Sequence, residues 1–170
     1  MKIRKGTWET NSSSTHSIAI SKEKVQIPKG TTIKFHIGEY GWEEEEYSFP
    51  DYLYTTLICS DNNEAIKRLE VILDDWGVNY EFQIPVYHYY GDKNQFKYVD
   101  NGYVDHYEDA EKIMLEILDK PDLLARALFG DAIVYTGNDN SSEEDSMCFC
   151  AWKRHPNHNS KKYDYFFKGN

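Results

Sequence analysis

The sequence has no apolar run that approaches the roughly 18 residues of a membrane-spanning helix. Residues 1–8 are basic and lack the apolar core of a secretory signal peptide. The chain contains three cysteines, Cys59, Cys148 and Cys150, which are too few for a disulfide framework. We therefore expect a cytoplasmic protein with reduced thiols and no membrane partner.

The common sequence motifs of phosphate binding and hydrolysis are also absent. There is no P-loop, no G-x-G-x-x-G after a strand, no H-E-x-x-H and no G-x-S-x-G nucleophile elbow. These absences exclude the best-known nucleotide-binding loops, the zinc hydrolases of that motif and the α/β-hydrolases. The sequence consequently points to no cofactor.

Aromatic residues and acidic charge are what the chain has in quantity. Aromatic residues make up 15% of the 170 residues and include 14 tyrosines, which favours a folded core over a disordered chain. The formal net charge is −10, but residues 1–30 and 151–170 each carry +4, so residues 31–150 carry −18. The basic ends favour contact with an anion, whereas the acidic body either keeps the protein soluble or contacts a basic partner.

The most informative stretch is the polar run Asn11-Ser12-Ser13-Ser14-Thr15-His16-Ser17. All seven side chains can hydrogen-bond, and His16 is the one that can carry charge near neutral pH. The run offers more polar side chains than a turn between strands requires. We interpret it as a loop, either a solvated linker or a site whose hydroxyls and backbone N–H groups hold an anion.

Ser14 and His16 also raise the hypothesis of a catalytic pair. A histidine within hydrogen-bond distance can activate a serine hydroxyl as a nucleophile. Here the two residues are only two positions apart on a predicted loop, so ligand binding is the safer interpretation.

Two segments nearer the C-terminus carry potential metal ligands. Gly137-Asn138-Asp139-Asn140 follows a predicted strand, but its spacing is not that of an EF-hand, and a structural turn is favoured. Cys148, Cys150, His155 and His158 could bind zinc. Their spacing departs from the zinc-finger patterns, and cysteines two apart in a strand share one face, which suits a core. We therefore predict no bound metal.

The segment Glu9-Thr10-Asn11-Ser12-Ser13-Ser14-Thr15-His16-Ser17 resembles the E-T-N-S-S-S-x-H-S signature of small uncharacterised proteins from phages and their Gram-positive hosts. Some of those proteins also carry a G-N-D-N segment, as residues 137–140 do here. The resemblance covers a small part of the chain and brings no known activity. It implies a phage or mobile-element context and a cytoplasmic location, and it marks the two segments as candidate sites.

Apolar periodicity predicts helices at 51–59, 61–76, 108–118 and 121–129. It predicts strands at 2–8, 16–21, 31–37, 78–84, 132–135, 147–152 and 163–167, and a hairpin over 96–104. The opening strands are expected to pair antiparallel. Helix 61–76 is expected to begin with an Asp61–Glu64 capping box and to end at Gly77.

Because strands precede and follow a helical middle, we predict one α+β domain over residues 1–170. A mostly antiparallel sheet from the N- and C-terminal strands should pack against three or four central helices. The residues predicted to be buried are Leu69, Ile72, Ile113, Ile117 and Val134.

These features favour binding of an anionic small molecule such as a nucleotide, which in a phage would counter a host defence. The predicted ligand-binding residues are Asn11, Ser12, Ser13, Ser14, His16, Arg4, Asn138, Asp139, Asn140 and Arg154. Arg4, Lys5, Lys153, Arg154 and His155 are expected to border the loop.

Two other functions stay open. One is an acidic inhibitor that mimics nucleic acid and binds a host nucleic-acid-handling protein through Glu43–Glu46 with Asp74, Asp75 and Asp92. The other is a hydrolase that uses Ser14 and His16. The sequence does not decide whether the protein is an enzyme. Direct nucleic-acid binding is not expected, and a homo-oligomer is left open.

Overall fold

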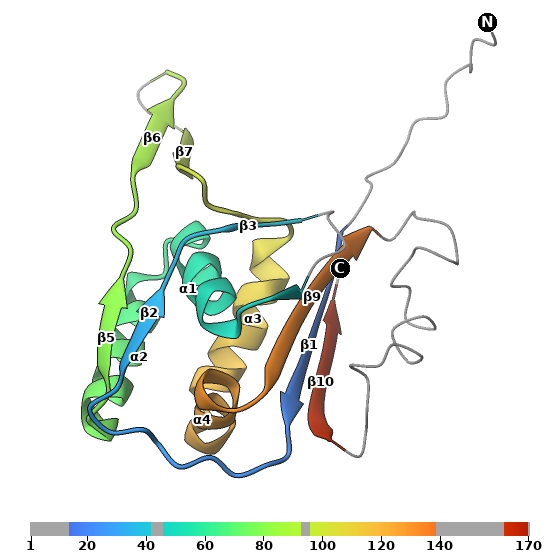
Figure 1. The fold of residues 1–170 in the computed structure, drawn as a ribbon. Helices are drawn as coiled ribbons and strands as arrows, with labels where there is room; N and C mark the ends of the chain where they lie inside the picture. The colour runs from blue at the N-terminus through green and yellow to red at the C-terminus, as the bar shows by residue number, and fades with distance from the viewer. Residues whose placement is uncertain (1–13, 42–45, 93–95, 139–161, 170) are drawn as a thin grey trace, which may run out of the picture.

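A four-stranded sheet forms one layer of the fold in the computed structural model, which describes residues 14–41, 46–92, 96–138 and 162–169. The strands are β1 (Ser14–Ser21), β4 (Glu46–Tyr47), β9 (Ala132–Asn138) and β10 (Tyr163–Gly169). They run in the order β10-β1-β9-β4, and every neighbouring pair is antiparallel (Figure 1). The N- and C-terminal strands therefore share one sheet, as predicted.

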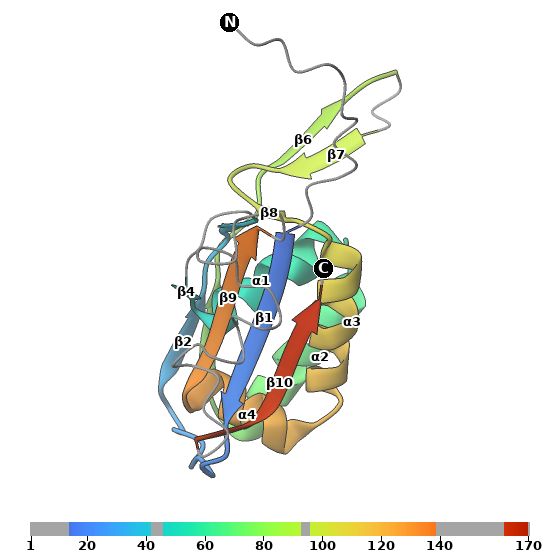
Figure 2. The same cartoon turned by 90° about the vertical axis from the view of Figure 1, so that its right-hand side faces the viewer.

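The structure describes four helices on one side of this sheet (Figures 1 and 2). They are α1 (Phe49–Cys59), α2 (Asn63–Trp76), α3 (Tyr107–Leu118) and α4 (Pro121–Phe129). Of these, α1, α3 and α4 contact the sheet, whereas α2 packs against α1 and against the strand β5 (Asn79–Phe82). Each lies within two residues of its predicted bounds, and the predicted α+β class is confirmed. None of the helices in the described ranges combines the length and apolar character needed to cross a bilayer.

Strand β1 lies inside the sheet and is paired on both edges. Ser14 lies opposite Asn138 of β9, and His16 lies between Thr136 of β9 and Gly169 of β10. The strand predicted over 16–21 is confirmed, but Ser14 and Thr15 were predicted to lie in the loop before it. That part of the prediction is wrong, because the sheet ladder also takes up the backbone groups of these two residues. The part of the polar run before Ser14 lies outside the described residues.

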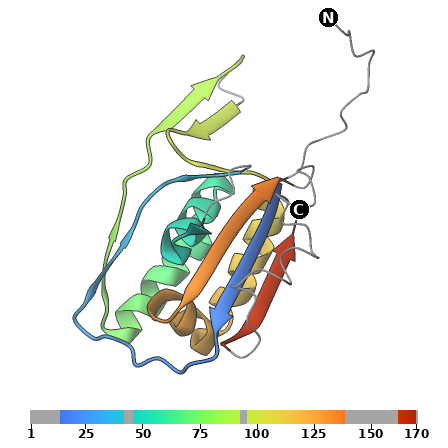
Figure 3. The same cartoon turned by 45° about the vertical axis from the view of Figure 1, so that its right-hand side comes forward.

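Three two-stranded pairs complete the fold beside the helices. The strands are β2 (Thr32–Phe35), β3 (Glu39–Tyr40), β5 (Asn79–Phe82), β6 (Tyr87–Tyr90), β7 (Phe96–Val99) and β8 (Tyr103–Val104). The pairs β2–β5 and β3–β8 are parallel, whereas β6–β7 is an antiparallel hairpin. This hairpin projects from the body in every view (Figures 1, 2 and 3).

Two predicted strand pairings are wrong. Strand β2 was predicted to pair antiparallel with β1. It pairs instead in parallel with β5, and α1 and α2 lie between the two strands in the sequence. The predicted hairpin over 96–104 is reduced to a turn with one antiparallel bridge between Val99 and Gly102, because β7 pairs back to β6 and β8 pairs with β3. Gly102 permits this arrangement, since a Cβ there would lie 2.7 Å from the Ile37 side chain that precedes β3.

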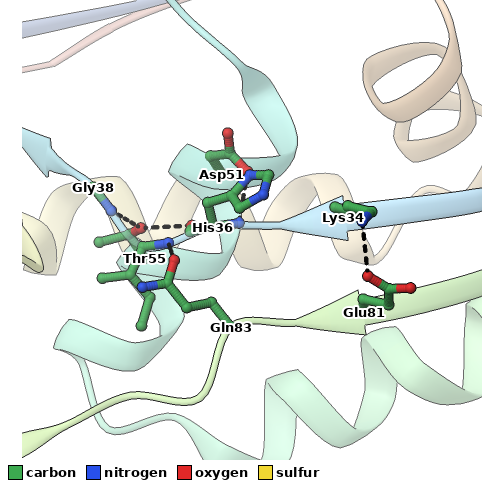
Figure 4. Close-up of polar contacts among 8 residues, drawn as sticks. Lys34, His36, Gly38, Asp51, Thr55, Glu81 and Gln83 are labelled. Carbon is green, nitrogen blue, oxygen red and sulfur yellow. Dashed lines mark hydrogen bonds and ion pairs between the residues drawn. The ribbon is translucent and has the colours of Figure 1, made fainter.

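Side chains hold the backbone where it leaves β2 (Figure 4). Asp51, Gln83 and Thr55 accept the N–H groups of residues 36, 37 and 38 at 2.7, 2.9 and 3.1 Å. These bonds replace the sheet ladder that the prediction extended to residue 37, so these three backbone donors are satisfied. The strand therefore ends at Phe35.

Helix α2 shows how the sequence sets a boundary. The Asn62 side chain accepts the N–H of Ala65, so Asn62 caps the helix, whereas Asp61 lies in a turn with φ of 55°. The predicted Asp61 cap is therefore wrong by one residue. Gly77 ends the helix in the left-handed conformation, with φ of 68°, as predicted.

The core lies between the helices and the sheet. Leu69, Ile117 and Val134 are fully buried, as predicted. Ile72 and Ile113 are only partly buried and pack at the margin of the core, so that part of the prediction is wrong. Both lie at the edge of the apolar stripe of their helix, which the helical period alone does not separate from its centre.

Candidate functional site

Ser14 and His16 form a buried polar cluster with a tyrosine of the first helix. Because residues two apart on a strand share one face, both side chains point toward α1. Ser14 Oγ lies 2.8 Å from His16 Nε2, and the Tyr52 hydroxyl lies 2.9 Å from His16 Nδ1. Ser14 and Tyr52 are 0% exposed and His16 is 3% exposed. We call Ser14, His16, Tyr52 and Asp105 the Ser14 cluster.

Burial keeps the imidazole of His16 neutral. Desolvation lowers the pKa of His16 to about 4, although the nearby Asp105 raises it. A neutral imidazole has one donor and one acceptor nitrogen. One of the two hydroxyls therefore donates to the ring and the other accepts from it. Burial also raises the pKa of Tyr52, so its phenol stays protonated.

Asp105 joins the cluster to the turn between β8 and α3. Its Oδ2 accepts the backbone N–H of Ser14 at 3.3 Å, and its Oδ1 accepts the Tyr103 hydroxyl at 2.8 Å. Its own N–H donates to the Tyr40 carbonyl at 2.9 Å. The carboxylate thus ties the start of β1 to elements about 90 residues away in the sequence.

The geometry of the Ser14 cluster has the parts of a nucleophile, a base and an orienting group. Two observations oppose that use. The Ser14 hydroxyl is fully buried, and a histidine with a pKa near 4 is a weak base at neutral pH. The arrangement favours a structural role, in which three elements are fastened by satisfied polar groups.

Most of the other predicted ligand residues cannot be placed. Arg4, Asn11, Ser12, Ser13, Asp139, Asn140 and Arg154 lie outside the described residues, as do Lys5, Lys153 and His155. Asn138 ends β9 directly opposite Ser14, so the two segments singled out in the sequence do meet at this corner of the sheet. Ligand contact by these residues stays a prediction.

A basic cavity lies beyond the other end of β1. Its volume is about 410 Å³, within the range of small-molecule sites. Its lining includes Lys22, Lys24, Val25, Ile27, Trp76, Pro121, Asp122, Ala125 and Arg126. These residues come from the segment after β1, the end of α2 and the first turns of α4, which converge in Figure 1.

The basic cavity combines positive charge with apolar walls. Lys22, Lys24 and Arg126 supply three cations against the single carboxylate of Asp122. Arg126 also donates from Nη1 to the Ser21 carbonyl at 2.7 Å, which fixes α4 to the end of β1. Trp76 forms one wall and is held edge-on against Phe129 at a ring distance of 6.0 Å. The cavity suits an anion that carries an apolar or aromatic group.

This cavity was not predicted from the sequence. Lys22 and Lys24 were counted in the basic N-terminal segment, but nothing in their spacing pointed to Trp76 or Arg126. Tyr52 and Asp105 were missed for the same reason, because their partners lie 36 and 91 residues away in the chain. Single basic residues in the segment after a strand and in a helix are too common in protein sequences to identify such a site.

A smaller cavity of about 160 Å³ lies at the base of the β6–β7 hairpin. Tyr87, Tyr98, Tyr103 and Tyr107 contribute to its lining, together with Cys59. Burial raises the pKa of the Cys59 thiol to about 11, so this cysteine is unreactive as a thiolate at neutral pH. Within the ranges that the structure describes, no three histidine, cysteine or acidic side chains gather as metal ligands.

The fold and these sites define an α+β protein with a buried serine–histidine cluster and a basic, tryptophan-walled cavity. Comparison with family models, curated proteins and solved structures finds no match.

Proposed function

We propose that the protein binds a small organic anion, of the size and chemistry of a nucleotide, in the basic cavity. The observation that carries this proposal is the convergence of Lys22, Lys24 and Arg126 on a 410 Å³ cavity with a tryptophan wall. In a chain with a net charge of −10, three cations around one cavity create a local potential opposite to that of the molecule.

The residue types in the cavity suggest which part of a nucleotide each of them would bind. Lysine and arginine N–H groups bind phosphate or carboxylate oxygens, and the N-terminal end of α4 adds partial positive charge. An indole face accepts a planar ring by stacking, at a gain of about 1–3 kcal/mol per base. In the phage context that the sequence resemblance implies, holding a nucleotide would sequester a host defence signal.

The test is thermal unfolding of the protein with mononucleotides, with the corresponding nucleosides and with inorganic phosphate. A ligand at a hundred times its dissociation constant should stabilise the fold by about 2.7 kcal/mol. For a chain of this size that is a rise of about 5–10 °C in the melting temperature. A mononucleotide should raise it more than the nucleoside or phosphate alone, because only the mononucleotide uses both the cations and Trp76.

A matched pair of variants localises the site. Lys24→Glu should remove most of the shift, whereas Lys29→Glu, an exposed lysine of the same segment that does not line the cavity, should retain it. The proposal fails if no compound shifts the wild type or if both variants weaken the shift equally. If Ser14→Ala abolishes the shift while Lys24→Glu leaves it intact, the ligand binds at the N-terminal polar run instead.

A further inference from the structure

The β6–β7 hairpin and its stem carry most of the exposed apolar surface. Within the described residues, six of the seven large hydrophobic side chains that are exposed lie between positions 84 and 103. They are Ile84, Val86, Tyr89, Tyr90, Tyr98 and Tyr103, with exposed fractions of 50–86%. We call residues 84–92 and 96–103 the tyrosine arm. The hairpin projects from the body (Figure 3), and apolar surface concentrated on one element is typical of an interaction site.

One face of the hairpin is a ladder of aromatic rings. His88 pairs with Tyr98 across the strands, and their rings stack at 5.0 Å with an interplanar angle of 18°. Tyr90 continues the ladder on the same face, 5.8 Å from Tyr98. Tyr90 and Tyr98 remain about half exposed or more, so the ladder presents ring surface to solvent.

On the opposite face of the hairpin, a tyrosine ring already contacts a cationic side chain. The Lys97 ammonium lies 4.0 Å from the centre of the Tyr87 ring and 2.8 Å from Asp61 Oδ1. A cation over a tyrosine face with a carboxylate beside it is a stable arrangement. The ladder face also has a carboxylate next to its rings, since Asp100 Oδ1 lies 3.7 Å from Nε2 of His88, the ring that stacks on Tyr98.

The charge next to the tyrosine arm favours some classes of binding partner over others. Residues 84–103 contain two acidic and two basic residues, and the acidic excess lies directly after them, in residues 105–111, which contain four acidic residues and no lysine or arginine. This excess repels the phosphates of a nucleic acid, although aromatic ladders on strands otherwise suit stacked bases. A second copy of the chain, with a net charge of −10, is repelled as well. A cationic protein is attracted.

We propose that the tyrosine arm is a docking surface for a protein partner that presents arginine side chains. A guanidinium group is planar and stacks on Tyr90 and Tyr98, while its N–H groups reach the Asp100 carboxylate. Arginine and tyrosine are also the residues that most often anchor protein interfaces. This inference is independent of the ligand proposed for the basic cavity.

The test uses a fluorescein-labelled peptide of alternating arginine and glycine, the lysine analogue of that peptide, and a labelled single-stranded RNA. Fluorescence anisotropy should show that the arginine peptide binds the wild type more tightly than the lysine peptide and that the RNA does not bind. Tyr98→Ser should weaken arginine-peptide binding about tenfold. Tyr98→Phe, which keeps the ring, should bind as the wild type does.

Val71→Ser is the matched control, because Val71 is 58% exposed on α2, away from the arm, and its loss should leave peptide binding unchanged. The proposal is overturned if the wild type binds neither peptide, if Tyr98→Ser binds as tightly as the wild type, or if the lysine peptide binds equally well. Binding of the RNA through Tyr98 would identify a nucleic-acid surface instead. A dimer in sedimentation that Tyr98→Ser disperses would identify a second copy as the occupant.

Discussion

At the scale of single residues, the position of a polar side chain on a strand decides its role. Ser14, His16 and Ser17 belong to the run that the sequence marks as a site, and all three are buried. Ser14 and His16 face the helices and hydrogen-bond to each other. Ser17 lies on the other face of β1, and its hydroxyl has no hydrogen-bond partner in the described structure. The three residues therefore make different contributions to stability.

The pH dependence of stability should report the burial of His16. Its pKa is about 4 in the folded protein and 6.5 in the unfolded chain, so the unfolded chain binds the proton more readily between these values. The stabilisation is complete above pH 6.5 and is lost as the pH falls toward 4. Urea unfolding should show a loss of about 2 kcal/mol in the free energy of unfolding between pH 7 and pH 5.

The control for this slope is His16→Gln, which cannot titrate and should remove it. Val71→Ala, at an exposed position of α2 that does not titrate, should leave the slope unchanged. If the wild type and His16→Gln lose the same free energy over this range, His16 is not the group responsible.

Ser14 and Ser17 offer a matched pair on one strand, both 0% exposed. Ser14→Ala leaves a ring nitrogen of His16 without its partner and should cost about 1–3 kcal/mol. Ser17→Ala removes a buried hydroxyl that lacks a partner, so it should be neutral or stabilising by up to about 1 kcal/mol. Equal losses from the two variants in urea unfolding would contradict the assigned hydrogen bond.

At the scale of elements, the helices follow from the sequence and the strand partners do not. Helix α2 has local signals at both ends and an apolar stripe of Ala65, Leu69 and Leu73 between them. The strand β2 has a clear alternation, but alternation carries no information on which strand lies beside it. Its partner β5 lies 47 residues further along the chain.

The packing of α2 against the core predicts how substitutions on its two faces change the free energy of unfolding. Leu69→Ala should lower the free energy of unfolding by about 2–5 kcal/mol, because Leu69 is 0% exposed and its loss leaves a cavity. Val71→Ala, on the exposed side of the same helix, should change it by less than about 0.5 kcal/mol. Thermal or urea unfolding of both variants makes the measurement. A Leu69→Ala protein as stable as the wild type would contradict the packing of this helix.

At the scale of the whole molecule, charge and aromatic surface are separated in space. The basic cavity lies beyond Ser21, at the end of β1, whereas the Ser14 cluster lies at its start. The tyrosine arm, with its acidic surroundings, projects from the body at a third place (Figure 2). The anionic ligand and the cationic partner that we propose would therefore not compete for the same surface.

The sequence alone determined the α+β class, the four helices with their approximate bounds, and the presence of N- and C-terminal strands in one sheet. These features depend on local periodicity, on glycine and proline breaks and on the order of strands and helices, all of which are readable along the chain. Tertiary structure decided the rest. It placed Tyr52 and Asp105 against Ser14 and His16, and it brought Trp76 and Arg126 to Lys22 and Lys24. Such contacts join residues tens of positions apart, and a site made of them exists only after the elements have packed.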